Sequence, residues 1–438
     1  MHVAIVGNGI TGVAAALRIR ERQPDWKITL ISGESTYHYS RPALMYLFMG
    51  HMKWEDVKPY PDDLWPRQRI GLVRDWVTGI DPAGKRLRLH RGPSLAWDRL
   101  LLATGSKSNR FGWPGQDLDG VHGLYDLMDL QRLTESCARA RRAVIVGGGL
   151  IGVELGEMLH SRGIDVTFLI REEAYWDNVL PREEAELVSR HIEARGFRLI
   201  RKRNLERIED DGNGRAAAVV DDAGERLPCE IVGLTPGVSP NTDLVRATEI
   251  GSARGILVDH GFRTSAPDVY AAGDCAEMVT GGDRNLIQQV WYTGRMQGEA
   301  AGDAVAGEEV RYEPRLWYNS AKFLDLEYQV YGDVPNRPRE GETHLYWEHP
   351  DGSRSVRLVT QAGRVTGVNV MGIRYRQEVC ERWIREEQPV AQVIDGLGEA
   401  NFDPELHRRF EGDVRAAFEG QLRGESLVGA AAARGRRQ

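Results

Sequence analysis

Short apolar runs alternate with stretches of helical spacing along most of this chain. The first run, Val3 to Val6, leads into Gly7-Asn8-Gly9-Ile10-Thr11-Gly12, and the apolar positions of residues 13–22 then recur with a helical period. This pattern predicts a strand, a turn and a helix that open a dinucleotide site. In such a site the first glycine allows the turn, the second lets a pyrophosphate approach the backbone, and the third lets the helix pack on the strand.

A second copy of this pattern follows later in the chain. Residues 143–146 form a β-branched run, Gly147-Gly148-Gly149-Leu150-Ile151-Gly152 repeats the glycine spacing, and residues 153–162 continue as a helix. Because each motif has a strand before it and a helix after it, the pair is a far more specific signal than one glycine run.

Two further predicted strands end in residues suited to contact a ligand. Residues 98–102 lead into Ala103-Thr104-Gly105, which either lets backbone approach a ligand or only makes a tight turn. Residues 262–272 lead into Gly273-Asp274, whose carboxylate would serve a ligand at the sheet edge, cap the next helix, or do both. A helix predicted from Val290 to Ala306 would point its N-terminus at the same ligand.

Candidate ribose-binding positions follow the second strand of each unit. Glu34 follows strand 27–31 and comes about 20 residues after Gly12, the spacing of a ribose-binding carboxylate; the alternative is a solvated loop glutamate. After strand 165–170 comes Arg171, which would favour a 2′-phosphate, but two glutamates follow it. The choice between NADH and NADPH therefore stays open.

The segments between these units are less regular. Residues 37–46 are aromatic and apolar, and they are either core or a wall for a planar ring system. Residues 51–80 show no long period and predict an insertion over the first domain. Residues 81–90 predict a hairpin. Residues 231–234 predict a strand that runs into a Gly/Pro loop containing Gly237.

The pattern of predicted elements changes from about Tyr312, where a separate α+β domain is expected to begin. Strands are expected within residues 353–371 and helices over residues 376–387 and 404–423. An aromatic cluster in this part is expected to form core or a subunit interface; its members are Trp317, Tyr318, Phe323, Tyr328 and Tyr331. The last residues, 424–438, are small and basic and predict a flexible tail.

Composition and charge narrow the function classes. The chain has 438 residues, 41% of them hydrophobic, and a formal net charge of -7, so it has no basic excess for binding nucleic acid. No apolar run is long enough to span a membrane, and no signal segment precedes the first strand, so we expect a cytoplasmic protein. Four widely spaced cysteines predict reduced thiols and no metal site: Cys137, Cys229, Cys275 and Cys380.

Taken together, these motifs resemble the FAD-dependent pyridine nucleotide-disulfide oxidoreductase superfamily. Tyr39-Ser40-Arg41-Pro42-Ala43-Leu44 is similar to the Arg-Pro-x-Leu segment of its rubredoxin reductase, ferredoxin reductase and nitrite reductase branch. The resemblance implies an α/β fold with two Rossmann-like domains, for FAD and for NAD(P), plus a C-terminal α+β interface domain. The implied ranges are 1–115 with 243–311 for FAD, 116–242 for NAD(P), and 312–423 for the interface domain.

The resemblance also implies roles for individual residues. Arg41 and Pro42 would lie beside the isoalloxazine, and Asp274 would hold a ribityl hydroxyl. The residues implied in FAD binding are Gly7, Gly9, Gly12, Glu34, Arg41, Pro42, Ala103, Thr104, Gly105, Asp274 and Val290. The residues implied in NAD(P)H binding are Gly147, Gly149, Gly152, Arg171 and Gly237.

Departures from the family pattern bear directly on function. Residues 38–50 contain no cysteine, and Ile10 stands where the peroxidase and oxidase members carry a histidine, so thiol or sulfenate chemistry lacks its sulfur. Tyr46 replaces the lysine that often pairs with the glutamate of the second dinucleotide helix, here Glu154. Either Lys53 supplies that partner or Glu154 contacts the nicotinamide without one.

We therefore expect an enzyme that passes hydride from NAD(P)H to the flavin N5 and electrons onward to a ferredoxin, a rubredoxin or a quinone. One alternative is an NAD(P)H oxidase or disulfide reductase that uses a distant thiol such as Cys275. Another is a non-catalytic flavin redox sensor. The chain is also a possible homodimer.

Overall fold

The computed structural model describes residues 1–282, 284–402, 405 and 408–424. These residues form two compact units, and each contains one of the two glycine motifs. The first unit comprises Met1–Gly112, Gly120–Ala140 and Thr235–Glu313; the second comprises Trp113–Asp119, Arg141–Leu234 and the chain from Pro314 onward. The finer division into three domains stays a prediction. The expected flexible tail lies, from residue 425 on, outside the described residues.

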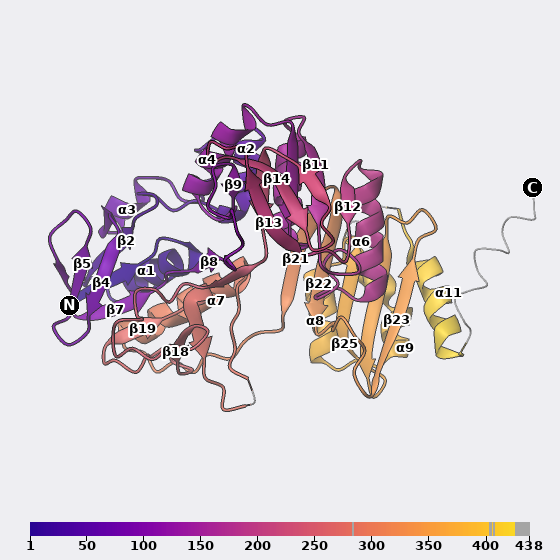
Figure 1. Ribbon diagram of the computed structural model, residues 1–438. Coiled ribbons are helices and arrows are strands. Elements are labelled where there is room, and N and C mark those ends of the chain that lie inside the picture. The colour runs from indigo at the N-terminus through magenta and orange to yellow at the C-terminus, as the bar shows by residue number, and fades with distance from the viewer. Residues whose placement is uncertain (283, 403–404, 406–407, 425–438) are drawn as a thin grey trace, which may run out of the picture. The chain divides into compact units, whose positions relative to one another are not determined.

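A parallel five-stranded sheet forms the centre of the first unit, in the order β19-β7-β1-β2-β3 (Figure 1). Its strands are β1 (His2–Val6), β2 (Lys27–Ser32), β3 (Ile70–Arg74), β7 (Arg99–Leu102) and β19 (Val269–Ala271). Every neighbouring pair is parallel, so the carboxyl ends of the strands meet at one edge. The turns that follow β1, β2, β7 and β19 are therefore gathered at that edge, where open α/β sheets bind ligands.

Strand β3 corrects the prediction that residues 51–80 are only an insertion. Residues 70–74 pair with β2 and complete the central sheet. The hydrophobic pattern did not predict this strand because it lies at the sheet edge, where only Ile70 is buried and Arg74 is exposed. An edge strand has too few buried positions to give a clear period of two.

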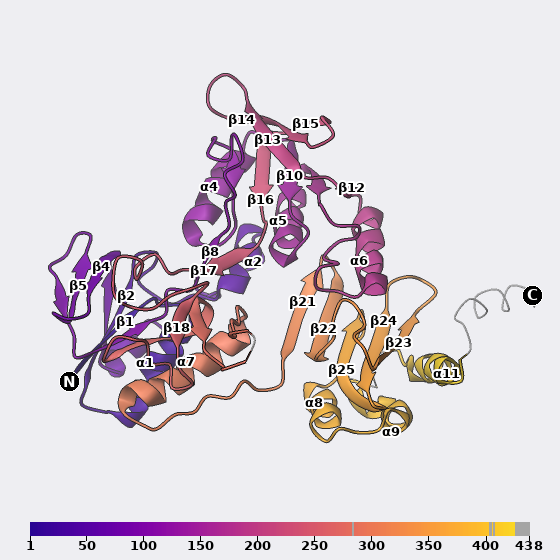
Figure 2. The ribbon, with the colours of Figure 1, turned by 60° about the horizontal axis from the view of Figure 1, so that its bottom comes forward.

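Two long helices of the first unit pack closely against each other: α1 (Ile10–Arg22) and α7 (Trp291–Ala306) (Figure 2). Glycines at positions 294, 298 and 302 of α7 face α1. A Cβ added at Gly298 would lie 2.4 Å from the Thr11 carbonyl oxygen, and one at Gly302 would lie 2.7 Å from Arg18 Cβ. The missing side chains thus let the two helices approach backbone to backbone.

Smaller elements complete the first unit. The hairpin expected at residues 81–90 is present as β4 and β5, but its first strand begins earlier than expected, at Val77; β6 pairs with β5. The remaining elements are η1 (Arg41–Ala43), α2 (Leu44–Phe48), α3 (Leu64–Arg67), β4 (Val77–Asp81), β5 (Arg86–Leu89), β6 (Leu95–Ala96), β8 (Ser106–Ser108), β9 (Val121–His122), α4 (Leu127–Cys137), β17 (Val238–Pro240), β18 (Ile256–Val258), η2 (Gly273–Cys275) and β20 (Ala276–Met278).

The second unit begins with another parallel sheet, in which β12, β11, β10 and β16 are neighbours in that order. These strands and their helices are β10 (Arg142–Val146), α5 (Leu150–His160), β11 (Asp165–Leu169), α6 (Arg182–Ala194), β12 (Arg198–Ile200) and β16 (Ile231–Leu234). A three-stranded antiparallel sheet is inserted before β16: β13 (Leu205–Asp210), β14 (Ala216–Asp221) and β15 (Arg226–Pro228).

An antiparallel five-stranded sheet, in the order β21-β22-β25-β24-β23, forms the C-terminal part of the second unit (Figure 2). Its strands are β21 (Tyr318–Phe323), β22 (Leu326–Gly332), β23 (Glu342–Glu348), β24 (Ser355–Gln361) and β25 (Arg364–Met371). Its core is shared with α8 (Gln377–Arg385), α9 (Val390–Asp395), α10 (Leu397–Ala400) and α11 (Glu411–Leu422). Phe323, Tyr328 and Tyr331 of the expected aromatic cluster are buried, whereas Trp317 is 37% exposed.

None of the helices in the described part of the chain combines the length and apolar character that a bilayer-spanning segment requires.

The close contact between α1 and α7 predicts the effect of adding one methyl group. Gly298→Ala should lower the free energy of unfolding by about 1–3 kcal/mol, because its Cβ meets backbone that cannot move aside. Gly412→Ala is the matched control in α11, where a Cβ meets nothing within 4 Å, and it should be neutral or stabilising by up to about 1 kcal/mol. Denaturant unfolding followed by circular dichroism measures both. Equal effects of the two substitutions would contradict this account of the packing.

Candidate functional site: two dinucleotide turns

The first glycine turn lies between two strand ends of the central sheet. Gly7 has φ of +111° and its N–H donates to the Ile31 carbonyl at 2.8 Å. A Cβ at Gly7 would lie 2.0 Å from the Ala103 carbonyl oxygen, and one at Gly12 would lie 2.0 Å from the Gly7 carbonyl oxygen. Both positions therefore require glycine, and they bring the ends of β1 and β7 together with the start of α1.

The N-terminus of α1 is open and uncapped. Gly9 is the N-cap residue, no side chain caps the helix, and its first turn contains no acidic residue. A Cβ at Gly9 would meet nothing within 4 Å, so the space in front of it is free. Unpaired N–H groups and the positive end of the helix dipole favour an anion at this place. The turn thus fits the pyrophosphate of a dinucleotide.

The predicted ligand residues after β7 and β19 meet at the same edge. Ser106 Oγ donates to Asp274 at 3.0 Å and accepts from Gln289 Nε2 at 2.6 Å. Burial raises the pKa of Asp274. Thr104 Oγ1 donates to the Asn241 carbonyl at 2.7 Å, which holds the Ala103-Thr104-Gly105 turn in place. Asp274 is thus held by a polar chain; it lies within the short helix η2 and does not cap α7.

The start of α7 offers a second uncapped helix end in this unit. Val290 is its N-cap residue, no side chain caps it, and its first turn has no acidic residue. The backbone N–H of Gly273 donates to Gln297 Oε1 of α7 at 2.8 Å, which ties this helix to the Asp274 turn. The expected dipole end near Asp274 is therefore available for partial negative charge on a ligand.

Glu34, Arg41 and two tyrosines form a compact ionic cluster. The Glu34 carboxylate accepts from Arg41 Nη2 at 2.9 Å, from the Tyr39 hydroxyl and from the Leu127 N–H at 3.0 Å. The Arg41 guanidinium lies 4.5 Å from the Tyr125 ring centroid and donates to the Tyr125 carbonyl. Glu34 therefore positions Arg41, and its predicted contact with a ribose stays a prediction. Pro42, next to Arg41, is exposed at the start of η1.

The second glycine turn has the same construction in the second unit. Gly147 has φ of +122°, Gly149 is the N-cap residue of α5 without a side-chain cap, and Gly152 is buried in the helix. The hydroxyl of the fully buried Tyr175 donates to the Gly149 carbonyl at 3.0 Å and fixes the turn. This uncapped helix end fits a second pyrophosphate.

Glu154 lies on α5, half a turn beyond the glycines. Burial, and then repulsion from the Glu157 carboxylate, raise the pKa of Glu154 to about 7, while the Lys322 ammonium opposes this rise. Lys322 belongs to β21, and its Nζ lies 3.9 Å from Glu157 Oε1. The structure thus provides a cation beside Glu154 that the sequence did not indicate, because Lys322 lies far from Glu154 in the chain.

The last two candidates for NAD(P)H binding are Arg171 and Gly237. Arg171 follows the buried Ile170 and forms a 3.0 Å ion pair with Glu172, with its own side chain 73% exposed. Gly237, at φ of +93°, belongs to the first unit, where its carbonyl accepts from the Asn109 N–H at 3.0 Å. The proposed contacts of both residues with NAD(P)H stay predictions.

A model of the family described as pyridine nucleotide-disulphide oxidoreductase matches residues 1–299 of this chain. The chain belongs to this family. It is 33% identical over 341 residues to the biphenyl dioxygenase system ferredoxin--NAD(+) reductase component of Paraburkholderia xenovorans, covering 76% of this chain and 81% of the relative. It is 28% identical to the NADH-rubredoxin oxidoreductase of Clostridium acetobutylicum, covering 76% and 82%.

A solved structure supports the fold of this family member. The ferredoxin reductase for the CYP199A2 system from Rhodopseudomonas palustris superposes with a TM-score of 0.77 at 24% identity, covering 84% of this chain and 91% of that one. The expected α/β class with Rossmann-type domains is confirmed. The protein is an oxidoreductase whose cofactors are FAD and NAD(P)H.

Several residues that shape the two turns were not found from the sequence. Asn8 donates from Nδ2 to the Ser35 carbonyl at 2.9 Å, Tyr125 accepts from the Ser106 N–H at 2.7 Å, and Tyr175 holds Gly149. Asn8 lies inside the first glycine motif, but no neighbouring residue indicates that its side chain would bind the Ser35 carbonyl. The two tyrosines lie far along the chain from the residues they hold, so no spacing rule could have identified them.

Because the space at Gly9 is open, a substitution there should affect the binding of FAD without affecting the stability of the protein. Gly9→Ala should leave the unfolding midpoint of the flavin-free protein unchanged, because its methyl group meets no protein atom within 4 Å. The same methyl group would occupy the approach of the pyrophosphate, so FAD should bind about tenfold or more weakly, equal to about 1.4 kcal/mol. Flavin content and fluorescence titration of the stripped protein measure this, with Gly412→Ala as control. Unchanged FAD affinity would place the pyrophosphate elsewhere.

The charge beside Glu154 predicts a shift in its titration. Lys322→Met removes a cation that favours the carboxylate, so the pKa of Glu154 should rise above its value of about 7. If Glu154 contacts the nicotinamide, the midpoint of the pH profile of flavin reduction by NADH should move to higher pH by the same amount. Lys322→Arg should restore the wild-type profile. A profile that does not move in Lys322→Met would separate Lys322 from this titration.

Proposed function

We propose that this protein is an NAD(P)H-dependent reductase of a small iron–sulfur electron carrier, of the ferredoxin or rubredoxin class. The proposal is supported by two uncapped dinucleotide turns in a chain whose relatives are named as ferredoxin and rubredoxin reductases. Bound FAD supplies hydride acceptance and one-electron release. The protein's own residues then need only to bind, orient and shield the two cofactors.

The carrying observation is that no cysteine lies in the segment where the thiol-dependent members of the family carry theirs, and that three of the four thiols are buried; the fourth, Cys137, is partly buried at the end of α4. Residues 38–50 contain no cysteine, and Cys229, Cys275 and Cys380 are buried as free thiols. The Cys275 thiol donates to the carbonyls of Leu102 and Ala272 at 3.4 Å each, and burial raises its pKa. A buried, protonated thiol is a poor nucleophile and a poor redox sulfur. Electrons are therefore proposed to leave directly from the flavin.

Residue roles follow from the two units taken separately. In the first, Gly7, Gly9 and the start of α1 hold the FAD pyrophosphate, while Asp274 and the start of α7 hold its ribityl and ring edge. In the second, Gly147, Gly149 and Gly152 hold the nicotinamide dinucleotide. The Arg171–Glu172 ion pair neutralises the charge that a 2′-phosphate would need, so we favour NADH. A cytoplasmic location is proposed with the free thiols in support.

One anaerobic experiment tests this function. After reduction with NADH or NADPH in a stopped-flow instrument, the flavin should be reoxidised rapidly by an oxidised [2Fe–2S] ferredoxin or a rubredoxin, and at least tenfold more slowly by oxygen or a disulfide. Cys275→Ser should retain the full rate, because the thiol takes no part. Loss of turnover in Cys275→Ser would favour the thiol alternative. Slow reduction followed by a stable reduced complex would favour a redox sensor.

A further inference from the structure

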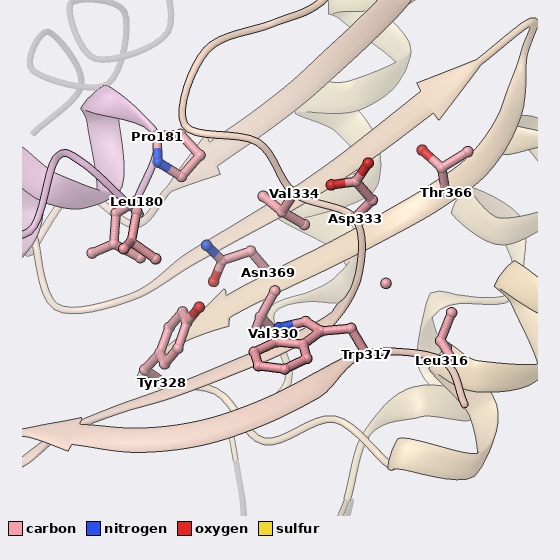
Figure 3. A pocket seen from close by; sticks show the side chains of 12 residues that line it. Leu180, Pro181, Leu316, Trp317, Tyr328, Val330, Asp333, Val334, Thr366 and Asn369 are labelled. Carbon is pink, nitrogen blue, oxygen red and sulfur yellow. The ribbon is translucent and has the colours of Figure 1, made fainter. Parts of the chain in front are cut away.

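A cavity in the second unit is not used by either dinucleotide turn. Its volume is about 390 Å³, and most of its walls are apolar. Residues 179–181, before α6, form one side, and the strands β22 and β25 with the segment before β21 form the other (Figure 3). A cavity of this size lies in the range that accepts a small organic molecule.

Asn369 gives this cavity a polar feature that the fold itself does not satisfy. It lies on β25 with only 1% of its surface exposed, and neither its Nδ2 nor its Oδ1 has a hydrogen-bond partner. Figure 3 shows its amide directed toward the space between Leu180 and Tyr328. Because a buried amide without partners is unfavourable, an unpaired donor and acceptor side by side indicate a ligand that supplies the complementary pair.

The remaining walls define the shape and charge of that ligand. Trp317 and Tyr328 present aromatic rings, and Leu180, Val330 and Val334 add aliphatic surface. No lysine, arginine or histidine is among the lining residues, and the only charged one, Asp333, is paired with Arg339. The cavity therefore disfavours phosphates and carboxylates and favours a neutral, flat molecule.

We propose that this cavity binds a neutral aromatic molecule carrying a lactam or carboxamide edge, which pairs with Asn369. The ligand N–H donates to Asn369 Oδ1, and the ligand carbonyl accepts from Asn369 Nδ2. This site goes beyond the proposed electron-transfer function, because none of its lining residues belongs to either glycine turn.

The aromatic cluster connects this cavity with the second glycine turn. Tyr328, in the cavity wall, has its ring centroid 5.8 Å from that of Trp176, which follows Tyr175 in the chain. Tyr175 in turn donates to Gly149. A ligand that fixes Tyr328 would thus act on side chains packed behind the nicotinamide dinucleotide site.

The test uses the FAD-containing full chain and two probes that differ by one methyl group. Quinolin-2(1H)-one has the adjacent N–H and carbonyl, whereas N-methylquinolin-2-one has lost the donor. Isothermal titration calorimetry, performed with NAD⁺ at saturation to fill the dinucleotide site, should show the first probe binding at least tenfold more tightly than the second. Equal affinity, or no binding of the first probe, overturns the proposal.

Variants locate the binding in the cavity. Asn369→Leu replaces the amide by a side chain of similar size, so it should weaken quinolin-2(1H)-one at least tenfold and remove the difference between the probes. Asn319→Leu, on β21 of the same sheet and outside the cavity lining, is the matched control and should bind as the wild type does. Wild-type binding by Asn369→Leu overturns the proposal. The probe comparison on the wild-type protein decides the question even where Asn369→Leu fails to fold.

Discussion

Unpaired backbone N–H groups at helix starts are the constraint on which both proposed nucleotide sites depend. Helices α1, α7 and α5 begin without a side-chain cap and without an acidic residue in the first turn. Side-chain caps usually stabilise a helix start by about 1 kcal/mol, and an anion bound at these three starts would take over that role. In the first unit the glycines of α7 allow it to lie against α1, so two such helix ends belong to one packed pair.

Charged groups around these turns are held by partners within their own unit. Arg41 forms an ion pair with Glu34 and stacks on the Tyr125 ring. These two contacts hold its guanidinium in place. Glu154, in contrast, is not held in its charged form. Burial and the Glu157 carboxylate favour its neutral form, and the Lys322 ammonium opposes them. A carboxyl group with a pKa near 7 can hold or release a proton at physiological pH, as the proposed role of Glu154 near the nicotinamide requires.

Local patterns predicted the parts of this structure that depend on neighbouring residues. The two glycine motifs, the strands before them, the hairpin at residues 81–90 and the helix after Val290 all follow from periodicity and turn chemistry, and the structure confirms these elements. Strand β3 was not predicted, because its single buried residue, Ile70, leaves no alternation of buried and exposed positions to detect. The roles of Tyr125, Tyr175 and Lys322 could not be predicted for another reason. Each of these residues contacts residues that are distant in sequence, and only the folded chain brings them together.

Electrons are proposed to pass through the flavin alone, without a redox-active thiol pair. Counting the reducing equivalents that the protein takes up tests this most directly. In an anaerobic titration of the FAD-containing protein with dithionite, followed by flavin absorbance and by thiol content, uptake should stop at two electrons per bound FAD and no new thiols should appear. Uptake of four electrons per FAD, with two thiols appearing, would contradict it.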